Sequence, residues 1–190
     1  RFRINQVRLE RILWAVFKDF CAPIVHHMVN NIRCFICYPL LAKEMNMTDI
    51  LHRVVIETSP EKLYKALTEQ RGLSSWWTKA ETTAKAGTVA SFRFGPNGDH
   101  KVDMKITELV PNEKVAWKCV AGPWVDTKEF SFEIKPDERG SIVEFANRGW
   151  PEPSEFFMHC NSKWGFFLGV SLKDYLETGK GKPHPQDPKL

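Results

Sequence analysis

Five consecutive segments between residues 88 and 147 alternate apolar and polar side chains, and one long amphipathic segment follows them. Each alternating segment is typical of a strand with one buried face, and turn sequences such as GPNGD at 95–99 separate neighbours. Charged residues occupy the opposite face, so the pattern predicts an antiparallel sheet that is covered on one side only. The side chains predicted to point inward are Ala90, Phe92, Phe94, Val102, Met104, Ile106, Val115, Trp117, Cys119, Phe130, Phe132, Ile134, Val143, Phe145 and Asn147.

One more strand and two short helices are predicted before these segments. Residues 52–58 alternate in the same way, and Ser59 followed by Pro60 is a typical start of a helix. We expect Gly72 to end this helix and residues 73–77 to form a second short helical turn. The buried stripe of the first helix would be Leu63, Ala66 and Leu67.

The last predicted element is a helix over residues 154–178, closed by Gly179 as its C-cap. Apolar residues recur in it three or four positions apart, which is the spacing of a buried helical stripe. These are Phe157, Cys160, Trp164, Phe167, Ser171 and Tyr175. The whole order predicts an α+β helix-grip fold, in which a curved six-stranded antiparallel sheet wraps around the long C-terminal helix and two short helices follow strand one.

The charge divides the chain into two parts near Met47. The part before Met47 contains seven basic and three acidic residues, and the part after it contains twenty basic and twenty acidic residues. We therefore expect an N-terminal extension over residues 1–46 and a helix-grip domain over 47–190. A domain without net charge has no electrostatic reason to bind nucleic acid, so we expect no nucleic-acid partner.

The first 46 residues give weaker signals than the rest. An apolar stripe runs through Leu9, Leu13, Val16 and Phe20 beside basic residues, a pattern that would suit either a membrane surface or the domain itself. The longest uncharged run, at 20–32, holds 13 residues and is too short to span a bilayer. Because MTDILHRVVIETSP from Met47 resembles a natural start, we expect residues 1–46 to be translated upstream sequence or sequence added in cloning, without selected structure, or at most partly helical.

A zinc site is the sharper alternative for the same region. Cys21, His26 or His27, and the pair Cys34 and Cys37 offer ligands of the right type, and Cys34-Phe-Ile-Cys37 has a ligand spacing. No second Cys-x-x-C pair accompanies it, so we expect no metal. Without paired cysteines or a signal-peptide pattern, the expected location is the cytoplasm.

Four stretches of the sequence together resemble a known family. These are VVIETSPEKLYKALTEQRGLSSWWT, ITELVPNEKVAWKCV, NRGWPE and SKWGFFLGVSLKDYLETGKGKPHP. Over residues 48–186 they are similar to the START-like (SRPBCC) superfamily, and more closely to its AHSA-like branch, named for homology to the activator of a heat-shock ATPase. The resemblance implies the helix-grip fold and a deep cavity between sheet and helix that holds lipids, polyketides or other apolar molecules, and its name also suggests stress response.

The inward-facing residues support a binding site in the same place. Large aromatic side chains on a strongly curved surface leave a gap more easily than they fill one, although a packed aromatic core is the competing interpretation. Asn147 would orient a ligand carbonyl or hydroxyl, or else bond the backbone near Gly149. The predicted ligand-binding residues are Trp76, Trp77, Phe92, Phe94, Met104, Trp117, Phe130, Phe132, Phe145, Asn147, Cys160, Trp164 and Phe167.

The adjacent Trp76 and Trp77 are expected to divide their roles. Neighbouring residues on a helix or strand do not point into one core. We expect Trp76 to anchor the short helix and Trp77 to lie half-exposed on the rim of the cavity, or the two roles to be exchanged.

The sequence shows few residue patterns that are typical of catalysis. His159 and Cys160 are neighbours on the predicted helix and point about 100° apart, so they form no catalytic dyad. No phosphate loop, metalloprotease helix or nucleophile elbow is present. The prediction is therefore a domain that binds a small hydrophobic molecule without a cofactor or a membrane span. The alternative is a cyclase or hydrolase that acts on a polyketide-like substrate, and a weaker alternative is a co-chaperone-like protein-binding module. The chain could also pair with a second copy of itself as a homodimer.

Overall fold

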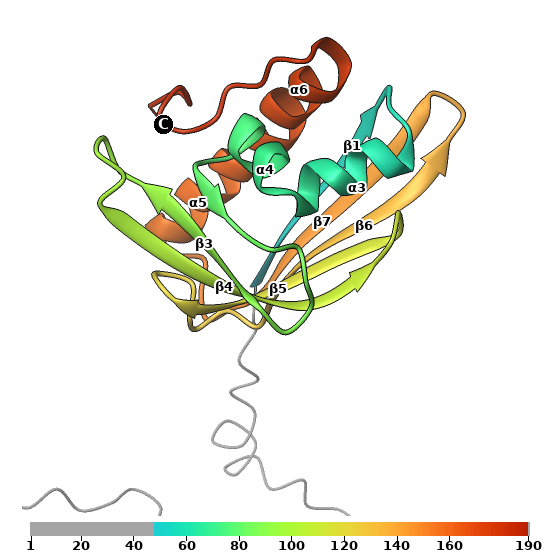
Figure 1. Ribbon diagram of the computed structural model, residues 1–190. Coiled ribbons are helices and arrows are strands. Elements are labelled where there is room, and N and C mark those ends of the chain that lie inside the picture. The colour runs from blue at the N-terminus through green and yellow to red at the C-terminus, as the bar shows by residue number, and fades with distance from the viewer. Residues whose placement is uncertain (1–47, 190) are drawn as a thin grey trace, which may run out of the picture. The chain divides into compact units, whose positions relative to one another are not determined.

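The computed structural model describes residues 48–189, which form a sheet, two short helices and one long helix (Figure 1). The basic stripe and the zinc arrangement considered for residues 1–46 lie outside this range. The strands are β1 (Thr48–Ile56), β2 (Ala80–Glu81), β3 (Val89–Phe94), β4 (His100–Val110), β5 (Lys114–Ala121), β6 (Glu129–Asp137) and β7 (Gly140–Trp150). The helical elements are α3 (Pro60–Thr68), α4 (Gln70–Trp76), α5 (Glu155–Phe166), η1 (Phe167–Leu172) and α6 (Lys173–Thr178).

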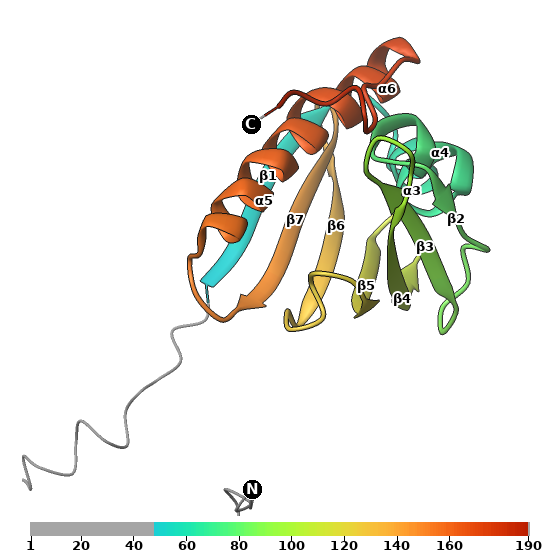
Figure 2. The ribbon, with the colours of Figure 1, turned by 90° about the vertical axis from the view of Figure 1, so that its left-hand side faces the viewer.

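The sheet is antiparallel throughout, in the order β1-β7-β6-β5-β4-β3-β2. It curls so that its concave face receives the long helix, as Figures 1 and 2 show. The pairing aligns the predicted inward residues across strands, for example Phe132 opposite Phe145 and Trp117 opposite Phe130. The α+β helix-grip prediction is therefore confirmed, with a seventh strand added.

The seventh strand, β2, has two residues, Ala80 and Glu81, which pair with Phe92 and Ser91 of β3. A segment of two residues shows no alternation, so the sequence pattern contained no signal for it. Its role is to close the edge of the sheet beside β3, next to the segment that leaves α4.

The first two helices differ from the prediction at Gly72. The side chain of Ser59 accepts a hydrogen bond from the Lys62 amide and caps α3 as expected, but α3 ends at Thr68 because Glu69 is extended. Gly72 lies inside α4 instead of breaking a helix. A Cβ there would lie 2.7 Å from the Cα of Ala66, so the glycine allows α3 and α4 to approach closely.

The long C-terminal helix contains a change of helical type. Residues 155–166 are α-helical, Phe167–Leu172 form a π-helical stretch, and residues 173–178 return to α-helix before Gly179 ends the helix in a left-handed conformation. Its buried side chains belong to the predicted stripe and its neighbours: Cys160, Trp164, Phe167, Leu168, Ser171 and Leu172.

The centre of the domain is filled by aromatic rings. The ring of Trp164 on α5 lies 4.3 Å from that of Phe145, and Phe132 lies 5.0 Å from Phe145 and 4.9 Å from Trp117. These side chains are almost completely buried. The expected deep cavity between sheet and helix is therefore absent at this point, where the described residues pack ring against ring.

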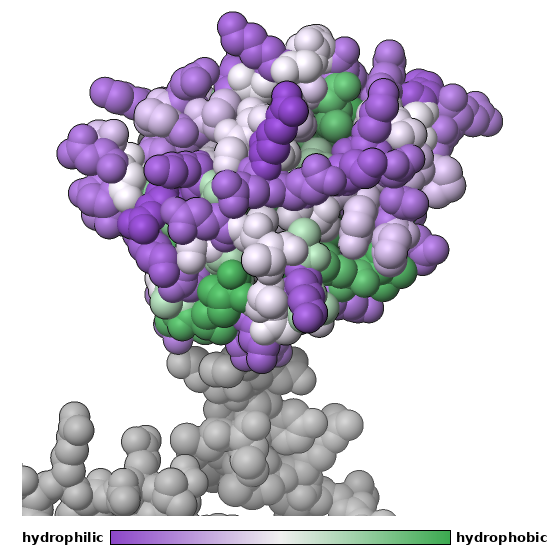
Figure 3. Space-filling view, viewed as in Figure 1, coloured by the Kyte–Doolittle hydropathy of each residue, from purple (hydrophilic) through white to green (hydrophobic). Residues whose placement is uncertain are grey.

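The outer surface is largely polar. Figure 3 shows hydrophilic residues over most of the face seen there, with smaller apolar areas among them. Among the described residues, no helix is long and apolar enough to cross a membrane.

Candidate functional site

A pocket of about 810 Å³ lies at one end of the aromatic interior. Its walls come from α5 and η1, the β3–β4 hairpin, the loop around Trp124 and the segment that follows α6. Its lining combines an aromatic interior with exposed polar residues. The lining residues are Trp77, Phe94, Asp99, His100, Lys101, Val102, Pro123, Trp124, Phe156, His159, Cys160, Lys163, Trp164, Phe167, His184, Asp187 and Lys189.

Trp77 joins the aromatic centre to this pocket. Its ring lies 5.0 Å from Trp164 and 5.6 Å from Phe94, and Phe94 in turn meets Trp124 edge-on at 6.0 Å. Only 2% of Trp77 is exposed. The prediction that Trp77 lies half-wet on the rim is therefore wrong, because the indole forms a wall deep in the pocket.

Both tryptophans are buried at the C-terminal end of α4. Trp76 is the last residue of α4, whereas Trp77 is its cap with φ −111° and ψ −75°. Their rings stack at 6.1 Å with an interplanar angle of 20°, and Trp76 Nε1 donates a hydrogen bond to the Ala66 carbonyl at 2.9 Å. Neighbouring side chains on a helix point only about 100° apart, which leaves both rings free to pack in the interior.

The structure separates the thirteen predicted site residues into two groups. Five line the pocket: Trp77, Phe94, Cys160, Trp164 and Phe167. Eight are buried in the core away from it: Trp76, Phe92, Met104, Trp117, Phe130, Phe132, Phe145 and Asn147. The aromatic pattern of the strands therefore marks the whole interior, and only its end is hollow.

Asn147 has a role inside the core. Its Oδ1 accepts a hydrogen bond from Trp150 Nε1 at 2.7 Å, and its Nδ2 donates to the Glu129 carbonyl at 3.3 Å. The side chain is fully buried. The amide thus joins β6 to β7 and satisfies the Trp150 indole, rather than bonding the backbone near Gly149 or facing a ligand.

Three polar residues of the pocket wall, His184, Asp187 and Lys189, come from a segment that strand and helix patterns did not single out. Residues 179–189, here called the C-terminal strap, run back from α6 alongside the long helix (Figures 1 and 2). The His184 amide donates to the Trp77 carbonyl at 2.8 Å, and the Lys182 amide donates to Ser171 Oγ at 2.7 Å. The signal available was the motif SLKDYLETGKGKPHP, which contains His184 but does not show where the strap lies.

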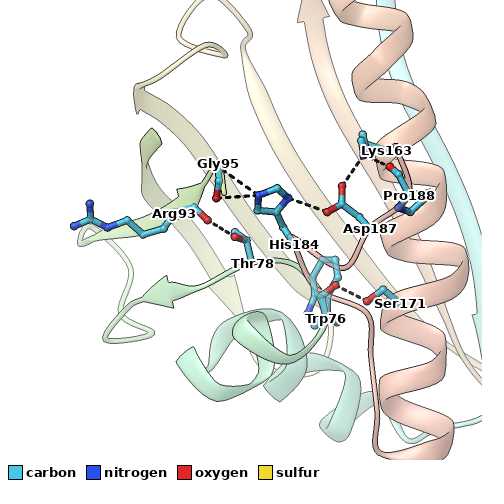
Figure 4. A network of polar contacts seen from close by, with 9 residues as sticks. All are labelled: Trp76, Thr78, Arg93, Gly95, Lys163, Ser171, His184, Asp187 and Pro188. Atoms are coloured by element: carbon cyan, nitrogen blue, oxygen red, sulfur yellow. Dashed lines mark hydrogen bonds and ion pairs between the residues drawn. The ribbon is translucent and has the colours of Figure 1, made fainter. Parts of the chain in front are cut away.

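Three side chains fasten the end of the strap across the pocket, as Figure 4 shows. His184 lies between Gly95 and Asp187, with its Nδ1 2.8 Å from Asp187 Oδ1. The other carboxylate oxygen of Asp187 pairs with Lys163 Nζ of α5 at 2.6 Å. The Asp187 and Lys163 side chains are 7% and 18% exposed, so this is a largely desolvated ion pair.

The surroundings of Asp187 set its charge. Burial raises the pKa of the carboxyl, but hydrogen bonds from Lys163 and His184 outweigh that effect, and the net pKa lies below its ordinary value. Asp187 is therefore ionised at neutral pH and holds both neighbours.

Comparison with known proteins identifies the family. Residues 57–177 match the family described as activator of Hsp90 ATPase homolog 1-like protein. The chain belongs to this family. A solved structure described as the Aha1 dimer from Colwellia psychrerythraea is 42% identical, with 71% of this chain and 100% of that chain covered and a TM-score of 0.64. No curated protein matches the chain.

Two more distant structures show the fold alone. A protein from Staphylococcus saprophyticus is 17% identical, with 70% of this chain and 95% of that chain covered and a TM-score of 0.61. DynU16, from the dynemicin biosynthetic locus, is 18% identical, with 70% of this chain and 48% of that chain covered and a TM-score of 0.60. Members of this fold class thus keep the architecture with little sequence in common.

In this family member, the pocket histidine is not arranged as a general base. Gly95 N–H donates to His184 Nε2 at 3.1 Å, the Gly95 carbonyl oxygen lies 3.4 Å from the same nitrogen, and Nδ1 lies 2.8 Å from Asp187 Oδ1. Both ring nitrogens are therefore used to hold the strap against the β3–β4 hairpin. A base needs a free nitrogen facing the substrate.

The pocket thiol is not an activated nucleophile either. Burial raises the pKa of Cys160 to about 11, although Trp124 Nε1 donates a hydrogen bond to its Sγ at 3.4 Å. The thiolate is the reactive form of cysteine, and it is scarce at neutral pH at such a pKa. Within residues 48–189, no group of three or more potential metal-ligating side chains is gathered in one place.

Proposed function

We propose that this domain binds a small, largely apolar molecule in the pocket beneath the C-terminal strap. The observation that carries the proposal is a hollow of about 810 Å³ at the end of an interior that is otherwise filled. Ligand pockets have volumes of about 300–1,000 Å³ and are lined by aromatic side chains with a few polar groups. Trp77, Phe94, Trp124 and Trp164 supply the aromatic walls here.

The same geometry supports binding over catalysis. His184 has both nitrogens occupied, Cys160 is a protonated thiol, and Asp187 is held by two partners. A cyclase or hydrolase needs a nucleophile and base, or paired carboxylates, that face the substrate. None of these three residues supplies such an arrangement in the pocket.

A fluorescent probe tests the binding proposal. N-phenyl-1-naphthylamine, a neutral aromatic molecule, is expected to bind near one equivalent and to quench tryptophan emission, because Trp77, Trp124 and Trp164 line the pocket. Phe156→Ala should weaken binding by about threefold or more, because Phe156 lines the pocket while 41% of it is exposed. The matched control is Val89→Ala, which removes a 49% exposed apolar side chain outside the pocket and should leave affinity unchanged.

Two results would contradict the proposal. The first is an absence of saturable probe binding to the native protein. The second is an equal loss of affinity in Phe156→Ala and Val89→Ala, which would indicate general surface adsorption. Native mass spectrometry of protein taken from cells would then identify whether any small molecule co-purifies.

We also infer that the domain forms a homodimer. The inference is supported by the 42% identical structure described as an Aha1 dimer, which this chain covers completely. Light scattering after size exclusion tests it on the full chain. A monomeric mass at the highest soluble concentration would contradict it.

We further propose that the folded unit begins near Met47 and works in the cytoplasm. The seven-stranded sheet and the helices α3 to α6 all lie within the described residues, which begin with β1. Cys119 and Cys160 are free, buried thiols, which suits a reducing compartment. A fragment that starts at Met47 should unfold cooperatively, and cell fractionation tests the location.

A further inference from the structure

We propose that residues 185–189 form a lid over the pocket, latched by Asp187, and that ligand exchange requires the latch to open. The inference rests on the proposed function, because it concerns access to that same pocket.

The first half of the strap is a fixed anchor. Gly181 is buried, and a Cβ on it would lie 2.3 Å from the Ser75 carbonyl oxygen, so the backbone is threaded tightly between α4 and the long helix. Ser171 Oγ donates to the Trp76 carbonyl at 2.6 Å and accepts from the Lys182 amide. With the His184 amide on Trp77, these bonds hold the strap as far as residue 184.

The second half is held differently. Residues 185–189 include no fully buried residue, and they form no hydrogen bond to a strand or helix backbone among the described residues. Their attachment to the rest of the domain is polar: Asp187 bonds His184 and Lys163, and Lys163 also donates to the Pro188 carbonyl. The lid is thus a short segment held by one side-chain cluster.

Such a latch is suited to opening. A buried ion pair gives little net stability, because its attraction is offset by the water that both charges lose. When the lid swings out from residue 184, Asp187 and Lys163 regain that water while the anchor and the aromatic centre stay in place. Segments that move in binding are those with few buried apolar contacts.

The lid also forms part of the wall that a ligand must pass. Asp187 and Lys189 of the lid and Lys163 of the latch line the pocket. The other walls come from α5 and η1, the β3–β4 hairpin, the loop around Trp124 and the anchored His184. Opening the latch therefore widens the entrance without disturbing the fold, which is the usual task of a lid in ligand exchange.

Stopped-flow kinetics with N-phenyl-1-naphthylamine tests the proposal on the full chain. Asp187→Asn removes the charge and keeps the shape, so the association and dissociation rates should both rise about fivefold or more, with the Kd changed by less than about threefold. A variant that only lost a contact with the bound probe would instead show mainly a faster dissociation rate. Lys163→Gln opens the latch from its other half and should act in the same way.

Asp174→Asn is the matched control. It removes a carboxylate that pairs with Lys182 of the strap at 2.9 Å but lies outside the pocket, so both rates should stay within twofold of the wild type. Unchanged rates in Asp187→Asn and Lys163→Gln would overturn the lid while leaving the binding proposal intact. Equal acceleration in the control would also overturn it, because the effect would belong to the whole strap.

Hydrogen exchange tests the lid without any ligand. The Gln186 amide of the lid donates to the Pro183 carbonyl of the anchor at 2.7 Å. Opening of the lid at residue 184 breaks this bond, so exchange of the Gln186 amide should be about tenfold faster in Asp187→Asn than in the wild type. Amides at the centre of β6 should exchange at the same rate in both proteins. An unchanged rate at Gln186 would overturn the latch even if the probe failed to bind, whereas probe failure alone would count only against the proposed function.

Discussion

The aromatic centre and the pocket end of this domain share one helix but are closed in different ways. At the centre, Trp164 packs directly on Phe145, and rings from neighbouring strands fill the remaining space. At the pocket end, the opposite wall is the polar strap, fastened by Asp187 and Lys163. The difference shows that large inward aromatics do not decide whether such an interior is solid or hollow. The interior is filled where strands face the long helix, and it is hollow where the irregular strap faces it.

The largest expected effect comes from emptying the centre. Phe132→Ala should lower the free energy of unfolding by about 3–5 kcal/mol, the usual cost of removing a large buried aromatic side chain. Phe132 is fully buried among Trp117, Phe145 and Trp164, and it does not line the pocket. Urea unfolding measures the loss. The affinity of the folded fraction for the probe should not change. A large loss of affinity would contradict the separation of the filled centre from the pocket.

Trp77 belongs to both regions, so its removal should affect both measurements. Trp77→Ala is expected to cost about 3–4 kcal/mol of stability and also to weaken probe binding. Trp76→Ala should cost a similar amount, because Trp76 is equally buried and its indole bonds Ala66. A loss below about 1 kcal/mol for Trp77→Ala would restore the rim position that the sequence suggested.

Gly181→Ala tests the anchor of the strap with a smaller effect. The added Cβ would meet the Ser75 carbonyl oxygen at 2.3 Å, so the strap must shift from its groove. We expect a loss of about 2 kcal/mol, typical of overpacking at a tight site. Thermal unfolding measures the loss of stability. Gly179→Ala is a poor control, because the backbone of Gly179 has a left-handed conformation. Gly169→Ala is suitable, since nothing lies within 4 Å of its added Cβ.

The smallest expected effect is the pH dependence of the latch. Because the pKa of Asp187 is lowered in the folded protein, its contribution is fully present above the ordinary value of 3.8 and is lost as pH falls below it. Asp187→Asn should therefore cost about 1 kcal/mol at pH 7. The difference from the wild type should close as pH falls below about 4. A gap that stays constant with pH would mean that the charge of Asp187 is irrelevant to stability.

The strand pattern and the helical stripe were enough to predict the architecture, because each alternating face is buried as a whole. Phe132, Phe145 and Trp164 all occupy the predicted interior. The prediction was weaker at the ends of elements. β2 was too short to show a period, and Gly72 was interpreted as a helix breaker although it serves a close approach of two helices.

The candidate site was predicted only in its aromatic half. Trp77, Phe94 and Trp164 were identified because large apolar residues in alternation mark an interior. Asp187 and Lys163 were not, since their pairing joins positions 24 residues apart through the course of the strap. No local pattern encodes where a segment after a helix returns, and the proline residues at 183 and 185 indicated only that the helix does not continue.

The π-helical stretch at Phe167–Leu172 has a consequence for how this family can vary in length. A π turn holds more residues than an α turn, so it stores an extra residue within the helix. Loss of one residue there would let the helix close into a regular α-helix, and the residues after it would keep nearly the same direction, because the removed residue is the one that the wider turn holds in excess. Loss of one residue from the α-helical part at 155–166 would instead rotate one side of the helix relative to the other by about 100°. Trp164 could then not face the sheet while Ser171 still joins Trp76 and Lys182. We therefore expect this domain to tolerate a single missing codon within 167–172, with Ser171 kept, better than one within 155–166.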